Sequence, residues 1–161
     1  MEQYIVFVNN SQNLALNISK IERIIAFQQP KKIPESSDYL LGVIQHNGQI
    51  LPIVDLTMRL YEHYAPEVDD KKIIVVKWKN RLIGFVVEEI VSIESFHSEQ
   101  YEEMLQQNQI SKEYIHGFIL MEEDIIIVLD TDRIFDFEQA KEIKDGIEQA
   151  EDIEDGFEYE A

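Results

Sequence analysis

Two aspartates, Asp55 and Asp130, are the acidic residues that most resemble a reactive pair, because each ends an apolar segment in a similar sequence context. Two equivalent carboxylates can work as a general acid and a general base. Each aspartate is also followed by a short segment of helical composition, residues 57–61 and 131–135. An aspartate at that place accepts hydrogen bonds from the free N–H groups of a helical turn. We therefore predict that both are structural caps, and an acid-pair hydrolase is the less favoured alternative.

Other catalytic and metal-binding patterns are missing from the sequence. There is no cysteine, no Gly-x-Ser-x-Gly segment and no Gly-rich loop, because the glycines are isolated. No two histidines have the spacing of a metal-binding helix; they are His46, His63, His97 and His116. We expect neither a metal nor a cofactor, and we expect a protein that is not an enzyme.

Trp78 lies between Lys77 and Lys79, an arrangement that resembles a small stacking platform for nucleic acid. Trp78 also continues the alternation of Ile74 and Val76, which favours a core position. The formal net charge is −18, from 32 acidic and 14 basic residues. Such a charge repels phosphate groups, so the sequence predicts no nucleic-acid partner and no binding to anionic membranes.

The location of the protein is predicted from what the chain does not contain. Its first residues, MEQYIVFVNN, have neither the basic stretch nor the apolar core of a signal peptide. No apolar run approaches the roughly 20 residues that span a bilayer. Together with the missing cysteines, these features indicate a cytoplasmic protein that does not insert into the membrane.

The stretch from Tyr39 to Leu60 contains two apolar segments separated by Asn47-Gly48. This pattern predicts a β-hairpin, because Asn and Gly tolerate the positive φ of a tight turn. Pro52 has no N–H for a sheet, so we expect a bulge or a sheet edge there. Loops are predicted at residues 26–38 and 62–72, which are rich in proline and polar residues.

The chain repeats its pattern. At an offset of 69, the apolar residues of the first hairpin and of the segment after it fall on apolar residues of the second; Leu14, Leu16, Ile18, Ile21 and Ile24 fall on Ile83, Phe85, Val87, Ile90 and Ile93. Residues 39–56 match 114–131 at an offset of 75, so that Gly42 falls on Gly117 and Asp55 on Asp130. The sequence therefore predicts an internal duplication, with repeats near 4–60 and 73–135. Small all-β units of this kind close into barrels, and we expect two of them, fused.

Two helical segments are expected outside the matching parts of the repeats. Ser98, followed by acidic residues, suggests a short helix between residues 96 and 110. Residues 138–161 contain ten acidic residues and two lysines. Their apolar residues recur at helical spacing, which predicts an acidic helix that frays beyond Ala150; they are Ala140, Ile143, Ile147, Ala150, Ile153 and Phe157. We divide the chain into a domain of residues 1–137 and an acidic helix or tail of residues 138–161.

The hairpin also carries a resemblance to a known family. The segment GVIQHNGQILPIVDL, residues 42–56, is similar to the signature of the CheW-like chemotaxis coupling proteins. The similarity continues in IGFVVEEI at residues 83–90, in YIHG at 114–117 and in Leu129-Asp130. It covers roughly residues 3–136, and it implies two interlocked, five-stranded SH3-like barrels.

The resemblance also implies a function. Proteins of that family are scaffolds without enzymatic activity, which bind the regulatory domain of the CheA histidine kinase and the cytoplasmic tip of chemoreceptors. A hydrophobic groove between the barrels takes the helical hairpin of the receptor. Carried over by motif, the partner-binding residues here are Gln45, His46, Asn47, Gly48, Val86, Val87 and Glu88.

One position departs from the family pattern. The hairpin of the family usually reads Asn-Leu-Arg-Gly, whereas this chain reads Gln45-His46-Asn47-Gly48. An amide does not replace the planar guanidinium group of arginine. The main hypothesis is an adaptor between kinase and receptor. The alternative is a divergent scaffold that binds the kinase or other CheW-like domains without normal receptor binding.

Overall fold

The computed structural model describes residues 2–97, 101–103 and 113–160. The first repeat forms β1 Glu2–Asn9, β2 Gln12–Asn17, the 3₁₀ turn η1 Ile18–Lys20, β3 Ile21–Ala26, β4 Leu40–His46, β5 Gln49–Asp55 and α1 Leu56–Tyr61. The second forms β6 Lys72–Trp78, β7 Arg81–Val87, β8 Glu89–Phe96, β9 Tyr101–Glu103, β10 Ile115–Leu120, β11 Ile125–Leu129 and the 3₁₀ turn η3 Thr131–Arg133. The last element is α2, Phe137–Glu160.

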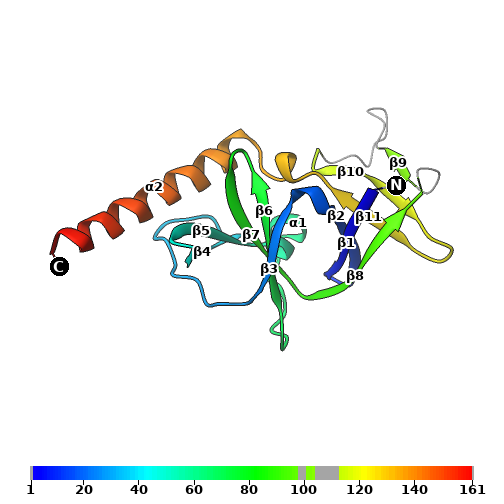
Figure 1. Cartoon of the computed structure of the whole chain (residues 1–161), viewed down its shortest axis with the longest axis horizontal. Coiled ribbons are helices and arrows are strands. Elements are labelled where there is room, and N and C mark those ends of the chain that lie inside the picture. The colour runs from blue at the N-terminus through cyan, green and yellow to red at the C-terminus, as the bar shows by residue number, and fades with distance from the viewer. Residues whose placement is uncertain (1, 98–100, 104–112, 161) are drawn as a thin grey trace.

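The strands form two sheets that have the same plan. The first sheet has the order β8-β1-β2-β11-β10-β9, and the second has the order β3-β6-β7-β5-β4. When the repeats are matched, β3 corresponds to β8, β6 to β1, β7 to β2, β5 to β11 and β4 to β10. Each sheet therefore takes strands from both repeats, as the blue β3 beside the green β6 shows (Figure 1).

The repeated Tyr-x-x-Gly motif forms the same structure in both halves. The ladder between β4 and β5 shifts register between Leu40 and Gly42, and the ladder between β10 and β11 shifts between Ile115 and Gly117. Gly42 has φ +143°, and a Cβ there would lie 2.2 Å from the carbonyl oxygen of Lys31. The glycine is required because the loop and the bulged strand approach so closely.

The β4–β5 hairpin has the predicted two-residue turn, with φ values of 50° at Asn47 and 76° at Gly48. Such turns follow the twist of the strands that they join. The bulge lies on β4 and β5 is an inner strand, but Pro52 itself lies at a local edge of the sheet, one of the two expected alternatives. Pro52 pairs with Val43, and the parallel ladder to β7 begins only at Ile53, so no second partner needs the missing N–H.

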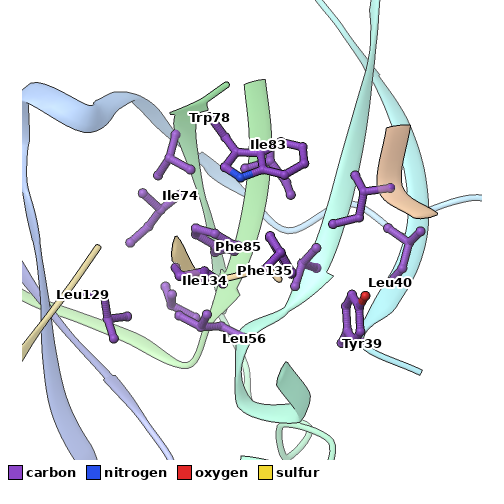
Figure 2. Packing of buried hydrophobic residues seen from close by; sticks show 14 of the residues in the cluster. Tyr39, Leu40, Leu56, Ile74, Trp78, Ile83, Phe85, Leu129, Ile134 and Phe135 are labelled. Atoms are coloured by element: carbon purple, nitrogen blue, oxygen red, sulfur yellow. The ribbon is translucent and has the colours of Figure 1, made fainter. Parts of the chain in front are cut away.

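The largest hydrophobic cluster contains residues of both sheets and of the segment after β11. Phe135 lies in its middle (Figure 2), with its ring centroid 5.6 Å from those of Tyr39 and Trp78 and 6.4 Å from that of Phe85. Each sheet has a smaller cluster on its other face. A segment of the second repeat thus completes the core against the second sheet.

Helix α2 begins with a capping box, in which Asp136 and Gln139 accept each other's backbone N–H over 2.8 and 2.9 Å. Ile143 and Ile147 are buried in the largest hydrophobic cluster, which we call the shared cluster because both sheets contribute to it. The helix continues through Glu160, so the fraying expected beyond Ala150 is not seen; the side chains of Ile153 and Phe157 lie outside the described part.

The helix expected between residues 96 and 110 is wrong where the structure describes that segment. Tyr101–Glu103 form β9, which pairs with β10 at the edge of the first sheet. Phe96 ends β8, and residues 98–100 and 104–110 of the expected helix lie outside the described residues.

Candidate partner-binding surface

The tip of the β4–β5 hairpin is the exposed part of the predicted site. Gln45, Asn47 and Gly48 are exposed, Gln45 at the end of the β4–β5 ladder and the other two in the tight turn. The side chain of His46 contacts the neighbouring strand β3, where its Nε2 lies 3.3 Å from the Oε2 of Glu22. The tip is therefore a rigid projection with polar side chains and backbone available to a partner.

The structure places Val86 and Val87 elsewhere than at the surface. Val86 is 2% exposed and belongs to the smaller cluster of the second sheet, and Val87 is fully buried in the shared cluster. Both lie on β7, an inner strand. Their side chains support the barrels from within, and contact of this segment with a partner stays a prediction.

Glu88 lies where the chain crosses from β7 in the second sheet to β8 in the first. Its Oε2 accepts the backbone N–H of Asn10 at 2.6 Å and the hydroxyl of Thr57 at 3.3 Å. The amide of Asn9 donates to Thr57 Oγ1 at 2.7 Å and to the carbonyl of Val86 at 3.3 Å. We call Asn9, Asn10, Thr57 and Glu88 the junction network.

The junction network joins the β1–β2 turn, helix α1 and the crossover after β7. Asn9 and Thr57 have no exposed surface, so each hydrogen bond satisfies a group that water cannot reach. Sequence reasoning missed both residues, although a polar residue within an apolar pattern is a usable signal. The network links the two sheets and holds the carboxylate of the half-buried Glu88 in place.

Asp55 is the N-cap of α1. Its Oδ1 accepts the N–H of Met58 at 3.1 Å, its Oδ2 accepts the N–H of Ala65 at 3.0 Å, and the residue is 4% exposed. Both carboxylate oxygens are therefore engaged in holding the backbone. A buried group of this kind is structural.

Asp130 has the same place after β11. Its Oδ1 accepts the N–H of Asp132 at 3.0 Å, and its Oδ2 lies 3.7 Å from Arg133 Nε. Arg59, which follows Asp55, instead places its guanidinium over the rings of Tyr114 and Phe135, at 5.5 and 5.9 Å. Each aspartate organises its own turn, and an acid–base pair finds no support in this geometry.

Trp78 is a core residue. It is 1% exposed, and its ring meets Phe135 edge-on. Lys77 and Lys79 are exposed, but the buried Trp78 between them offers no open ring face on which a base could stack.

Among the described residues, no group of histidine, aspartate and glutamate side chains has the geometry to hold a metal ion. Within the same part of the chain, no helix is long and apolar enough to cross a bilayer.

Comparison with known proteins identifies the family. A family model described as the CheW-like domain matches residues 3–139. The chain belongs to the CheW-like family. This CheW-like chain is 24% identical over 141 residues to the chemotaxis protein CheW of Bacillus subtilis, covering 87% of this chain and 90% of the relative. It is 28% identical over 136 residues to CheW of Thermotoga maritima, covering 84% and 89%.

A solved structure shares the fold of this CheW-like chain. The scaffolding protein TtCheW from Thermoanaerobacter tengcongensis superimposes with a TM-score of 0.77 at 20% identity, covering 86% of this chain and 94% of that protein. The all-β prediction of two fused, five-stranded SH3-like barrels is confirmed, and the first sheet carries β9 as a further strand.

Proposed function

We propose that this CheW-like chain is an adaptor of bacterial chemotaxis, which couples chemoreceptors to a CheA-type histidine kinase. The observation that carries the proposal is the family match across residues 3–139 on the two-barrel fold. The partners are the regulatory domain of the kinase and the cytoplasmic tip of the receptor. The chain works in the cytoplasm and has no catalytic activity of its own.

The architecture suits a scaffold. The junction network and the shared core hold the two sheets in one arrangement, so a partner meets a preformed surface. A preformed surface reduces the conformational entropy that binding costs. The division of the chain belongs to the same proposal: residues 1–137 bind partners, and the appended helix of residues 138–161 supports them through Ile143 and Ile147.

The test is binding with purified components. The chain is mixed with the regulatory domain of a CheA-type kinase and with a soluble fragment of a receptor tip from the same organism, and complexes are separated by size-exclusion chromatography. We expect a complex with each partner and a ternary complex with both. Failure of both at tens of micromolar, well above the range of stable complexes, contradicts the proposal.

Asn47 supports the second candidate, a scaffold that binds the kinase or another CheW-like domain without normal receptor binding. Asn47 has φ 50°, a backbone conformation that asparagine adopts more readily than arginine. The comparison is between the natural chain and Asn47→Arg, with Asn47→Lys as a control that has charge but no planar fork. Receptor binding gained only by the arginine variant supports this candidate, and receptor binding by the natural chain excludes it.

A further inference from the structure

A groove lies at one end of the second sheet, between the tips of two hairpins and helix α2. His46 and Gly48 line it from the β4–β5 tip, Lys79 and Arg81 from the β6–β7 tip, and Ile147 from α2. Its volume is about 530 Å³, which is sufficient for a few side chains of a peptide. We call it the tip groove.

The walls of the tip groove are rigid. Both hairpins close with two-residue turns of positive φ, at Asn47 and Gly48 and at Lys79 and Asn80. The pairs that flank these turns continue into regular antiparallel ladders. A Cβ at Gly48 would meet no atom within 4 Å, so the groove is open on that side. The site is present before any ligand arrives.

The tip groove has a positive charge in an acidic protein. Lys79 and Arg81 are exposed, and neither forms an ion pair within the described part of the chain. Lys20 and Lys77 line a second hollow, which shares Lys79 and Arg81 with the groove.

The acidic residues lining these two hollows are Asp132, which lies 3.6 Å from Lys20, and Glu151. Four cations and two acids give the residues lining the two hollows a formal charge of +2, and the rest of the chain therefore sums to −20 against the total of −18. An acidic ligand is repelled by the rest of the surface and attracted here.

The floor of the groove is apolar. Leu51 and Ile147 are almost fully buried there, and Ile50 and Leu82 are half-buried. An apolar floor beside two cations fits a peptide that combines carboxylates with an aliphatic side chain. Nucleic acid fits less well, because the only tryptophan is buried and the surrounding surface is strongly negative.

We propose that the tip groove binds an acidic peptide segment of a partner protein. Its carboxylates pair with Lys79 and Arg81, and its aliphatic side chain lies against Ile50 and Leu82. Glu151 lines the groove and opposes this binding by repulsion. The assignment stands apart from the kinase and receptor proposal, because it specifies the chemistry of the bound segment and not the protein that supplies it.

The test measures binding of a labelled peptide of repeated Glu-Glu-Leu units by fluorescence anisotropy, with its Gln-Gln-Leu counterpart as the neutral peptide. We expect the acidic peptide to bind and the neutral peptide not to bind. Lys79→Gln with Arg81→Gln weakens binding about fivefold, since two exposed ion pairs are lost. Glu151→Gln strengthens binding, and all effects decrease as salt is added.

The matched control is Lys32→Gln with Lys141→Gln, which removes the same charge from exposed positions outside the groove. It leaves binding nearly unchanged if the groove is the site. Equal weakening by the two double variants, or no binding of the acidic peptide to the natural chain, overturns the proposal. Circular dichroism verifies that each variant is folded, and neither kinase nor receptor is used.

Discussion

The backbone N–H of Asp55 donates a hydrogen bond of 2.8 Å to the carbonyl oxygen of Tyr39, across the open end of the β4–β5 hairpin. The second repeat has the same bond, from Asp130 to Tyr114, with the same length. In both halves the tyrosine precedes a bulge and the aspartate caps a helical turn. In each repeat, the tyrosine and the aspartate therefore form the same local structure, in which a hairpin ends and a helical turn begins.

The two caps should differ in their effect on stability. Asp55→Asn replaces one of the two buried carboxylate oxygens by an NH₂ group. That group faces the backbone N–H of Met58 or of Ala65, so one of the two hydrogen bonds is lost. We expect a loss of about 1–2 kcal/mol in the free energy of unfolding, measured with urea. Asp130→Asn is the matched variant in the more exposed turn, and it should cost about 0.5 kcal/mol. Equal losses at the two positions contradict the role assigned to burial.

Two buried threonines test the junction network. Thr57 bridges Asn9 and Glu88, so Thr57→Val leaves buried polar groups unsatisfied and should cost about 1–3 kcal/mol. Thr131 is equally buried, and its hydroxyl has no hydrogen-bond partner among the described residues. Thr131→Val should therefore be neutral or slightly stabilising. The melting temperatures of Thr57→Val and Thr131→Val are compared by thermal unfolding. Equal changes in the two variants would show that the junction network does not contribute to stability.

Two glycines with positive φ should respond differently to alanine. At Gly42 a Cβ would overlap the carbonyl of Lys31, so Gly42→Ala must move the loop or the strand. We expect a loss above about 3 kcal/mol. At Gly48 the space is open and only the left-handed backbone is unfavourable, which costs about 1–2 kcal/mol. Soluble yield and urea unfolding compare the two, and a milder effect at Gly42 would show that the bulge is adaptable.

Alkaline pH should unfold the protein through two buried tyrosines. Burial raises the pKa of Tyr4 and the pKa of Tyr39 to about 12, from an ordinary value of 10.0. The folded state holds these protons more tightly than the unfolded state, so the associated stability is complete below pH 10. It is lost as the pH rises from 10 to about 12.

Phenylalanine variants isolate this effect. Tyr4→Phe with Tyr39→Phe removes both ionisable hydroxyls and should reduce the loss of stability between pH 10 and 12. Tyr64→Phe, at a residue that is 54% exposed, should leave the pH dependence unchanged. The melting temperature is followed as a function of pH. The same alkaline loss in all variants would assign it to other groups.

The local features of the fold were readable from the sequence because neighbouring residues determine them. Asn47 and Gly48 specify a tight turn through their tolerance of positive φ, and Asp55 precedes a helical turn whose N–H groups need an acceptor. The duplication was visible because equivalent strands need the same alternation of apolar residues. The family motifs follow the same local patterns.

Only the tertiary structure decided how the halves combine. Equivalent strands of two repeats have nearly the same pattern, so β3 and β8 could each have paired within their own repeat. Period-two alternation specifies the face of a strand and leaves its neighbour open.

The site residues depended on this exchange of strands. Val86 and Val87 are buried because β7 is an inner strand of its sheet. The crossover from β7 to β8 brings Glu88 within hydrogen-bond distance of Asn10 and Thr57. The same long-range pairing places β9 in a sheet where acidic composition indicated a helix. It also brings Lys79 and Arg81 beside the β4–β5 tip and forms a groove between residues that are far apart in the sequence.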